Sequence, residues 1–239
     1  MERFSRVFPD LESVFVRGAT SNYQMAYLLE RCKLRCFKSN HLDGLVNEGL
    51  VSRWSSLRQI NLRVPGLDVD LTAVATYCPN IEEMRIDNGM FVLGSIIGSS
   101  LISNQEQFPC LKRLGLNTPL PIGEHESSYI FLPPAVIAFI LSRAPLLECA
   151  DFGYCSAIYD TDVERMLQDA GASRVQRLTL RGAYRLSNEA VMKLIQGFPE
   201  LKMMAMKILP RDRLVEMEKL KTCLKEQNAD VTLLTYGNY

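Results

Sequence analysis

The side chains that most often perform acid–base and nucleophilic catalysis are scarce in this sequence. Histidine occurs only twice among the 239 residues, as His41 and His125. A Ser-His-Asp or Cys-His arrangement needs one of them beside a nucleophile, and His125 stands in the polar sequence Gly123-Glu124-His125-Glu126, which favours a solvated side chain. The phosphate-binding motifs G-x-x-x-x-G-K-[ST] and G-x-G-x-x-G do not occur. We therefore expect no enzyme and no cofactor.

The seven cysteines are the other candidates for chemistry. Structural zinc usually takes four cysteine or histidine ligands, and the pair Cys32-x3-Cys36 has only His41 nearby. An odd number of cysteines in a chain of this length favours free, mostly buried thiols in a reducing compartment. We predict no metal site, packed thiols at Cys78 and Cys155, and an intracellular location, cytoplasmic or nuclear.

Composition excludes several classes of protein. Hydrophobic residues make up 47% of the chain, which is enough to bury a sizeable core and argues against disorder. The formal net charge is zero, from 27 basic and 27 acidic residues, whereas a nucleic-acid partner usually leaves a basic excess. The apolar run Phe91 to Ile102 is shorter than the about 18 residues of a membrane helix. We expect no nucleic-acid partner and no membrane span.

A short phrase recurs along the chain: an aromatic residue, Cys or Ala, then Pro, any residue, and Leu or Ile. Five of the eleven prolines stand in this context. The copies are Phe8-Pro9-Asp10-Leu11, Cys78-Pro79-Asn80-Ile81, Phe108-Pro109-Cys110-Leu111, Ala144-Pro145-Leu146-Leu147 and Phe198-Pro199-Glu200-Leu201. Counting from the Leu or Ile, apolar residues fall at relative positions one, four and six. Positions four and six share one face of an extended strand, so each copy predicts a short strand with one buried face.

Seven apolar triplets define the expected strands. They are Leu11/Val14/Val16, Leu57/Ile60/Leu62, Ile81/Met84/Ile86, Leu111/Leu114/Leu116, Leu147/Ala150/Phe152, Val175/Leu178/Leu180 and Leu201/Met204/Met206. The 46-residue step from Leu11 to Leu57 predicts one degenerate repeat near Cys32 to Phe37. The 36-residue step after Leu111 contains an insertion, Asn117 to Leu132, whose apolar residues either fold back onto the core or anchor a ligand.

Stretches with helical spacing precede most of these strands. Apolar residues three and four positions apart lie on one stripe of a helix. Such stripes are Leu71/Val74/Tyr77/Cys78, Val136/Ile137/Ile140/Leu141, Val163/Met166/Leu167 and Ala190/Val191/Leu194/Ile195/Phe198. Pro133-Pro134 can open the second helix, and Asp160-Thr161 offer N-caps for the third. The proline of the phrase then ends the helix and turns the chain toward the next strand.

The repeating unit is therefore a helix, a Pro-turn and a short strand. Stacked units bury the apolar face that one unit cannot, giving a curved parallel sheet on the concave side and helices on the convex side. We predict a single α/β solenoid of about 7–8 irregular repeats. Residues 1–56 would hold degenerate repeats and residues 57–210 the core repeats. Residues 211–239 would form a capping helix with the stripe Leu214/Met217/Leu220/Leu224, a strand at Val231 to Leu234 and a tail.

The repeats resemble those of the leucine-rich repeat superfamily, and in particular the cysteine-containing repeats of F-box/leucine-rich-repeat proteins. Leu147 to Leu167 carries this resemblance through a strand, Cys155 and the helix start Ile158-Tyr159-Asp160-Thr161-Asp162-Val163. Val175 to Leu201 has the same pattern, with Ala183 where the family has Cys. The resemblance implies a leucine-rich-repeat solenoid and a non-catalytic role in recruiting substrates to a ubiquitin ligase.

One part of the family pattern is missing. The F-box of these proteins docks a Skp-type adaptor, and no segment like it precedes Phe8. A contact with a Skp-type adaptor is then expected only through a missing or separate region. Two functions stay open: a substrate-recruiting module, or a non-catalytic assembly or scaffold factor with the same fold and no ubiquitin role.

The exposed strand positions would line the concave face, where we expect a protein partner to bind. The candidate residues are Arg17, Asn61, Arg63, Glu83, Arg85, Asp87, Arg113, Asn117, Asp151, Arg177, Arg181 and Lys207. Seven are basic and three are acidic, although the chain as a whole is neutral. Because arginine binds carboxylates and phosphates through paired N–H groups, we hypothesise an acidic or phosphorylated segment as the partner. The alternative is a solvated face whose basic residues are balanced by acids on neighbouring strands.

Overall fold

The computed structural model describes residues 10–43, 51–66, 68–93, 108–118, 131–170, 174–209, 211–226 and 230–237. Within these residues nine strands form one parallel sheet, and they follow one another across it in chain order. The strands are β1 (Ser13–Ser21), β2 (Cys36–Asp43), β3 (Gln59–Arg63), β5 (Glu83–Asp87), β7 (Arg113–Asn117), β8 (Cys149–Phe152), β9 (Arg177–Arg181), β10 (Met203–Leu209) and β11 (Thr232–Gly237).

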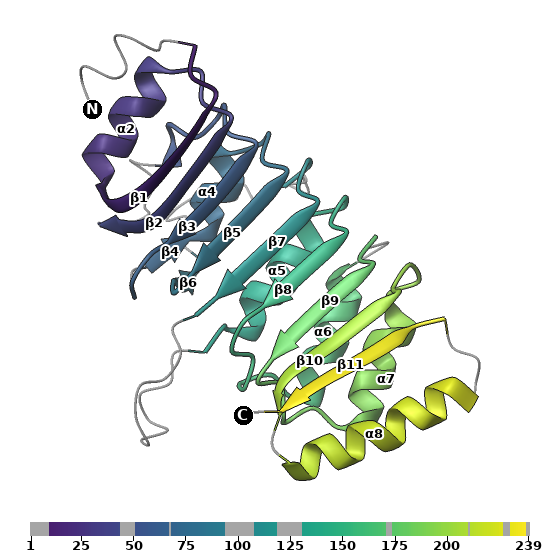
Figure 1. Cartoon of the computed structure of the whole chain (residues 1–239). Coiled ribbons are helices and arrows are strands. Elements are labelled where there is room, and N and C mark those ends of the chain that lie inside the picture. The colour runs from purple at the N-terminus through teal and green to yellow at the C-terminus, as the bar shows by residue number, and fades with distance from the viewer. Residues whose placement is uncertain are drawn as a thin grey trace.

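Helices connect the strands and pack along one side of the sheet, as Figure 1 shows. They are α2 (Asn22–Arg31), α4 (Leu71–Tyr77), α5 (Pro134–Arg143), α6 (Asp160–Ala170), α7 (Asn188–Gly197) and α8 (Arg211–Glu226). A second, two-stranded parallel sheet pairs β4 (Asp68–Asp70) with β6 (Met90–Val92), which the sequence patterns did not predict. The other face of the nine-stranded sheet, which we call the concave face, has no helix over it in the described chain.

The core lies between the sheet and the helices. From Leu57 onward, every residue of the predicted apolar triplets is buried. The degenerate repeat supplies Leu34, Phe37 and Ser39 in the same frame, and the buried Ser39 hydroxyl lies 3.2 Å from the hydroxyl of Thr20 on β1. Each repeat therefore adds one strand with one buried face, which is the arrangement that the spacing predicted.

The Pro-turns form as the phrase predicted. Helices α4, α5 and α7 all end at the residue before the phrase proline, at C-caps with non-helical backbone. In each described copy, the amide of the fourth residue donates to the carbonyl of the first. These bonds are Ile81 to Cys78, Leu111 to Phe108, Leu147 to Ala144 and Leu201 to Phe198. The copy at Phe8 lies outside the described residues.

The helix starts follow capping rules with one correction. Pro134 occupies the first turn of α5, as Pro133-Pro134 predicted. The prediction that Asp160 and Thr161 cap α6 is wrong, because both residues lie inside the helix. The carboxylate of Asp160 instead accepts the backbone N–H of Ser187 at 2.8 Å, and hydrogen bonding from the Ser187 side chain, together with this backbone bond, lowers the pKa of Asp160. Asp160 therefore connects one repeat to the next, while Ser187 itself caps α7.

The C-terminal repeat consists of α8 and β11. Met217, Leu220 and Leu224 are buried, and Leu214 packs at the edge of the core. Helix α8 lies against α7 and β11, and β11 extends to Gly237, further than the sequence indicated. The final helix thus carries its apolar stripe toward the fold, as a capping helix should. Most of the Asn117 to Leu132 insertion lies outside the described residues, although Leu132 is fully buried.

All seven cysteines are free thiols. Cys78 and Cys155 pack in the core, where burial raises the pKa of the Cys78 thiol to about 12 and also raises that of Cys155. Cys32 is buried too, but the other four are partly exposed, so the expectation of mostly buried thiols was wrong. In the described part of the chain no helix is long and apolar enough to cross a membrane. The repeating strands, Pro-turns and helices make this chain an α/β solenoid with a parallel sheet on one side and helices on the other.

Candidate functional site on the concave face

The parallel register arranges the outward residues of the sheet in three rows. The amino-terminal row contains Ser13, Cys36, Gln59, Glu83, Arg113, Cys149, Arg177, Met203 and Thr232. The middle row contains Phe15, Lys38, Asn61, Arg85, Gly115, Asp151, Thr179, Ala205 and Leu234. The carboxyl-terminal row contains Arg63, Asp87, Asn117, Gly153, Arg181, Lys207 and Tyr236.

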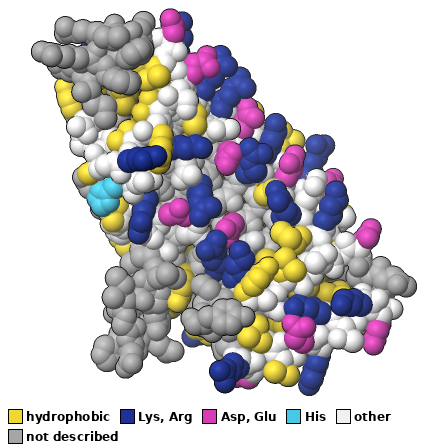
Figure 2. Space-filling view, in the orientation of Figure 1, with side chains coloured by type: hydrophobic (Ala, Val, Ile, Leu, Met, Phe, Trp, Pro, Cys, Tyr) yellow, Lys and Arg dark blue, Asp and Glu magenta, His cyan; other side chains and the backbone are white. Residues whose placement is uncertain are grey.

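Eleven of the twelve predicted binding residues stand in these rows, and all twelve side chains are exposed or half-buried. The twelfth, Arg17, lies at a register irregularity of β1, with its guanidinium 6.0 Å from the ring centre of Phe15. The sequence missed Lys38 because the degenerate repeat lacks a clear triplet; its side chain is exposed in the middle row. Figure 2 shows Lys and Arg side chains spread over this face of the molecule.

Each of the three acidic residues on this face pairs with one arginine. Arg113 donates from Nε and Nη2 to the same carboxylate oxygen of Glu83, at 3.1 and 2.7 Å. The remaining pairs are Arg85 Nε with Asp87 Oδ2 at 3.1 Å, and Arg181 Nε and Nη2 with the two oxygens of Asp151 at 3.1 and 2.6 Å. Acids on the same or a neighbouring strand therefore neutralise part of the face, as the alternative hypothesis expected.

Four of the seven predicted cations have no carboxylate partner among the described residues. Arg177 donates from Nε to the sulfur of Cys149 at 3.1 Å. Lys207 lies 5.7 Å from the ring centre of Tyr236, and the side chain of Arg17 covers Phe15. Arg63 forms no ion pair in the described part of the chain. The concave face consequently keeps an excess of four positive charges over the twelve residues, and Lys38 adds a fifth.

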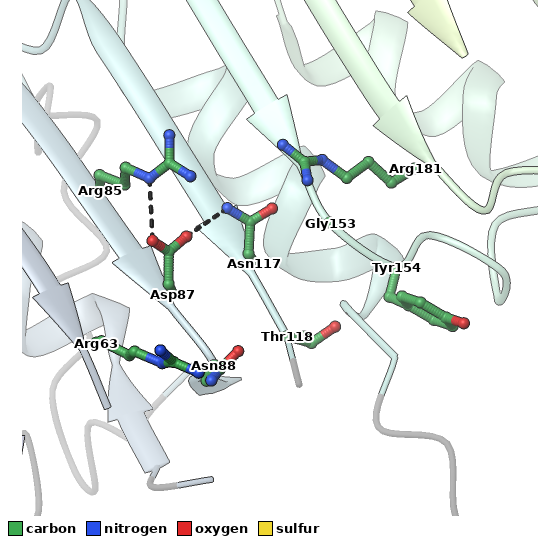
Figure 3. Close-up of a pocket in the computed structure, with 9 residues that line it drawn as sticks. All are labelled: Arg63, Arg85, Asp87, Asn88, Asn117, Thr118, Gly153, Tyr154 and Arg181. Atoms are coloured by element: carbon green, nitrogen blue, oxygen red, sulfur yellow. Dashed lines mark hydrogen bonds and ion pairs between the residues drawn. The ribbon is translucent and has the colours of Figure 1, made fainter. Parts of the chain in front are cut away.

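A recess of about 280 Å³ opens at the carboxyl ends of β3, β5, β7, β8 and β9. Figure 3 shows the nine residues that line it, which are Arg63, Arg85, Asp87, Asn88, Asn117, Thr118, Gly153, Tyr154 and Arg181. Three of them are arginines from three different strands, and only one is acidic. Five of the nine are predicted binding residues, so the fold gathers part of the predicted set into one concavity.

Gly153 lines the recess, and Gly115 stands beside it on β7. At Gly153, an added Cβ would lie 2.6 Å from Oδ1 and 2.8 Å from the backbone Cα of Asn117. Real side chains do not approach a backbone so closely, so only glycine fits there. At Gly115, an added Cβ would meet the Arg85 side chain at 3.4 Å, an ordinary contact. The stem of Arg85 therefore passes close to Gly115 on the next strand, while Gly153 leaves space between Asn117 and Arg181.

Two residues of the recess wall have left-handed backbone conformations. Asn88 follows β5 with φ of 63°, and Tyr154 follows Gly153 with φ of 51°. Asparagine tolerates this region, but it is uncommon for an aromatic residue. Such conformations persist only where the surroundings impose them, and they are concentrated at binding sites. Sequence patterns could have suggested these turns from Asn88-Gly89 and Gly153-Tyr154, whereas nothing in the sequence singled out Thr118.

Asp87 organises one side of the recess. Its two oxygens accept from Arg85 Nε at 3.1 Å and from Asn117 Nδ2 at 2.6 Å, as the dashed lines in Figure 3 show. The hydrogen bond with Asp87 raises the pKa of Arg85, so the guanidinium keeps its charge. Because Asp87 engages Nε, the terminal Nη groups of Arg85 stay available to a ligand. Asp151 similarly holds Arg181 by Nε and Nη2.

Two polar atoms at the recess are buried without a hydrogen-bond partner among the described residues. They are Oδ1 of Asn117 and Oγ1 of Thr118. Thr118 is only 4% exposed, so water cannot readily replace the missing partner. A buried polar group without a hydrogen bond costs about 1–3 kcal/mol. The recess is therefore basic, and of these two groups the Thr118 hydroxyl can donate a hydrogen bond to an anion, whereas Asn117 Oδ1 only accepts.

The cysteines and histidines of the described chain are not arranged as a set of metal ligands. Cys32 caps the C-terminus of α2 and is buried, whereas Cys36 lies on the concave face in the amino-terminal row. No group of three His, Cys, Asp or Glu side chains suited to a metal occurs among the described residues. His125 lies outside those residues, so its predicted solvation stays a prediction.

Comparison with known proteins adds a structural likeness only. No family model and no curated protein matches the sequence. Among the solved structures that are similar is a crystal structure of a yeast Rad7–Elc1 complex. The match has a TM-score of 0.48 and 13% identity, and covers 95% of this chain and 63% of the other. This chain thus spans less than two thirds of the matched one, and neither its activity nor its partners follow from the match.

Proposed function

We propose that this chain is a non-catalytic protein-interaction module that binds an acidic or phosphorylated segment of a partner across its concave face. The observation that supports this most is the uneven charge of the molecule. The chain is neutral overall, yet the concave face keeps an excess of four basic residues after every acidic residue on it has found an arginine. A cationic surface of this kind attracts acidic ligands and accelerates their association.

The rigid strands of the concave face also suit the binding of a protein partner. Solenoids present extended concave surfaces on rigid strands, and their outward residues can vary without disturbing the core. On β3, β5 and β9 the outward positions are polar or charged, while their neighbours on the same strands are buried and apolar. The finer proposal is that the partner is a substrate for a ubiquitin ligase inside the cell, as the family resemblance implies. An assembly or scaffold factor is the alternative.

Binding of synthetic peptide pools would test the general proposal. The chain should bind short Asp/Glu-rich peptides, with or without phosphoserine, more tightly than Lys-rich peptides in fluorescence anisotropy, and added salt should weaken the binding. Charge reversal of Arg63, Arg85 and Arg113 to Glu should reduce it strongly. A matched triple reversal on exposed helix positions, Arg165→Glu, Arg211→Glu and Lys219→Glu, changes the net charge equally and should leave binding nearly intact.

Equal loss of binding in both triple variants would contradict a concave-face site, because net charge alone would then explain the effect. Affinity purification followed by mass spectrometry separates the two finer functions. Recovery of a Skp-type adaptor with a cullin supports the ubiquitin-ligase proposal. A stoichiometric partner without either component supports the assembly alternative.

A further inference from the structure

We propose that the recess between Arg63, Arg85 and Arg181 is a phosphate subsite, which receives a phosphorylated serine or threonine of the partner segment. This inference rests on the proposed function and narrows it, because the rest of the concave face would contact ordinary acidic residues. The recess differs from the rest of the face in three ways: the number of arginines that converge, the volume that they enclose, and the unpaired Thr118 hydroxyl in its lining.

The recess is basic enough to attract a phosphate monoester. Its lining contains three arginines and one carboxylate, Asp87, and therefore has a formal charge of about +2. A phosphoserine or phosphothreonine side chain carries about −1.5 to −2 at neutral pH. Asp151, which pairs with Arg181 from the middle row, lowers the net charge around the recess to about +1. Charge alone therefore admits an acidic side chain as well as a phosphate, and the hydrogen-bond geometry separates the two.

The hydrogen-bond geometry also favours a phosphate. A carboxylate has two oxygens, which one guanidinium can satisfy, as Glu83 and Arg113 illustrate in the amino-terminal row. A phosphate monoester has three terminal oxygens that accept strong hydrogen bonds. In the recess, Arg63, Arg85 and Arg181 come from β3, β5 and β9 and surround the space from different sides (Figure 3). Three separate donors around one cavity fit three acceptor oxygens.

Carboxylates already position two of these arginines. Asp87 holds Arg85 through Nε, and Asp151 holds Arg181 through Nε and Nη2. Fixing the guanidinium groups beforehand reduces the entropy that a ligand must remove on binding. Arg63 has no such restraint among the described residues, so it can adjust its position to the ligand. Asp87 and Asp151 are therefore positioning residues rather than contacts of the phosphate.

Thr118 would provide the remaining contact with the phosphate. Thr118 lines the recess, and its hydroxyl is buried without a partner in the described chain. Such a group usually finds a hydrogen bond in native structures. A phosphate oxygen next to Thr118 would supply the acceptor that the Thr118 hydroxyl lacks. Gly153 lines the same recess, and any Cβ at that position would collide with Asn117.

Three peptide pools with random flanking residues and a fixed central residue would test the subsite. The central residue is phosphoserine, Asp or Ser, and binding to the full chain is measured by fluorescence anisotropy. We expect the phosphoserine pool to bind about tenfold or more tightly than the Ser pool, as charged hydrogen bonds predict. The Asp pool should fall close to the Ser pool. Inorganic phosphate should displace the phosphoserine pool only at far higher concentration than the peptide, because it lacks the flanking contacts.

Matched variants assign the effect to the recess. Arg63→Gln should remove most of the preference for phosphoserine, and Thr118→Val should reduce it by a smaller factor. Arg113→Gln serves as the control, because Arg113 lies in the amino-terminal row outside the recess. It should weaken all three pools equally and leave their ratio unchanged. Circular dichroism and thermal melts of each variant confirm that the fold persists.

Several outcomes would overturn the phosphate subsite without touching the general proposal. Equal binding of the phosphoserine and Ser pools to the wild-type chain is one. A phosphoserine preference that survives Arg63→Gln but disappears in Arg113→Gln is another, since it would place the phosphate elsewhere on the face. Displacement by inorganic phosphate as readily as by peptide would mean a site for free phosphate. Failure of acidic and phosphorylated pools alike to bind would instead refute the proposed function itself.

Discussion

The two ends of the same strands use the same residue types to different effect. At the amino-terminal row, Arg113 and Glu83 pair on neighbouring strands, and both side chains stay well exposed, at 52% and 40%. At the carboxyl-terminal row, arginines and Asp87 surround a recess. The Arg181–Asp151 pair beside it is less exposed, at 29% and 27%. One end is an open surface on which Arg113 and Glu83 neutralise each other, and the other is a partly enclosed, basic concavity.

The turns after the strands cause this difference. At the amino-terminal ends of β5, β7, β8 and β10 the chain arrives through the same Pro-turn, which gives these strands a common start. At the carboxyl ends the connections vary. Asn88 and Tyr154 adopt left-handed backbone, and Gly153 removes a side chain between Asn117 and Arg181. The comparison indicates that the repeated turns before the strands stabilise the fold, whereas the variable connections after the strands shape the recess.

The largest effect on stability is expected from truncation of a buried core residue on a strand that carries outward residues of both rows. Phe152 is fully buried on β8, between the outward residues Asp151 and Gly153. Truncation in Phe152→Ala should lower the free energy of unfolding by about 3–5 kcal/mol, through lost burial and the cavity left behind. Denaturant unfolding would measure this loss. The outward substitution Thr179→Ala on β9 is the control and should cost little, and a similar cost for both would contradict the division between core and outward faces.

The two outward glycines provide the next test. Gly153→Ala should destabilise the chain by about 1–3 kcal/mol, because Asn117 leaves no space for the methyl group. Gly115→Ala has ordinary contacts only, with Arg85, and should be neutral or stabilise the strand by about 0.5–1 kcal/mol. Thermal melts of both variants would show the opposite signs. A neutral Gly153→Ala would mean that the recess does not depend on this glycine.

The two arginine–carboxylate pairs give a smaller contrast. Asp151→Asn should cost about 1 kcal/mol, because the partly buried Arg181 loses a charged hydrogen-bond partner. Glu83→Gln should cost under about 0.5 kcal/mol, as is usual for exposed ion pairs. Equal costs in urea unfolding would remove the distinction between the two ends.

The smallest effects concern thiol reactivity. A thiol reagent followed by peptide mapping should modify Cys149 in the native chain, because it is partly exposed in the amino-terminal row. Cys155 and Cys78 should resist, since burial raises the pKa of both thiols and excludes the reagent. Saturating inorganic phosphate bound in the recess should leave the Cys149 rate nearly unchanged. Protection of Cys149 by inorganic phosphate would instead place the anion at the amino-terminal ends.

Much of the fold was predictable because its signals are local and repeated. The spacing of Ile81, Met84 and Ile86 recurs seven times, and each copy places two apolar side chains on one face of a strand. The phrase proline gave the helix ends for the same reason. The N-caps of α6 were misplaced because Asp160 bonds to Ser187 of the following repeat, a contact between residues far apart in sequence.

The candidate site was predictable only in part. Alternation along each strand identified Arg63, Arg85 and Arg181 as outward residues, since period two is a property of any strand. It could not indicate that they line one recess, because that depends on register between strands and on the turns that follow them. Thr118 was missed because it stands after the predicted strand, where alternation no longer applies.

The sequence by itself determined which face of each strand is buried, where helices end, and that basic residues outnumber acidic ones on the concave face. These properties follow from residue type and short-range spacing. The tertiary structure alone decided which arginines meet carboxylates and which surround the recess. The register between strands brings residues about thirty positions apart, such as Arg181 and Asp151, within hydrogen-bond distance. Residues with left-handed backbone follow two of the strands and line the recess. The excess of basic residues on this face follows from the sequence, but their arrangement into a site depends on the packed sheet.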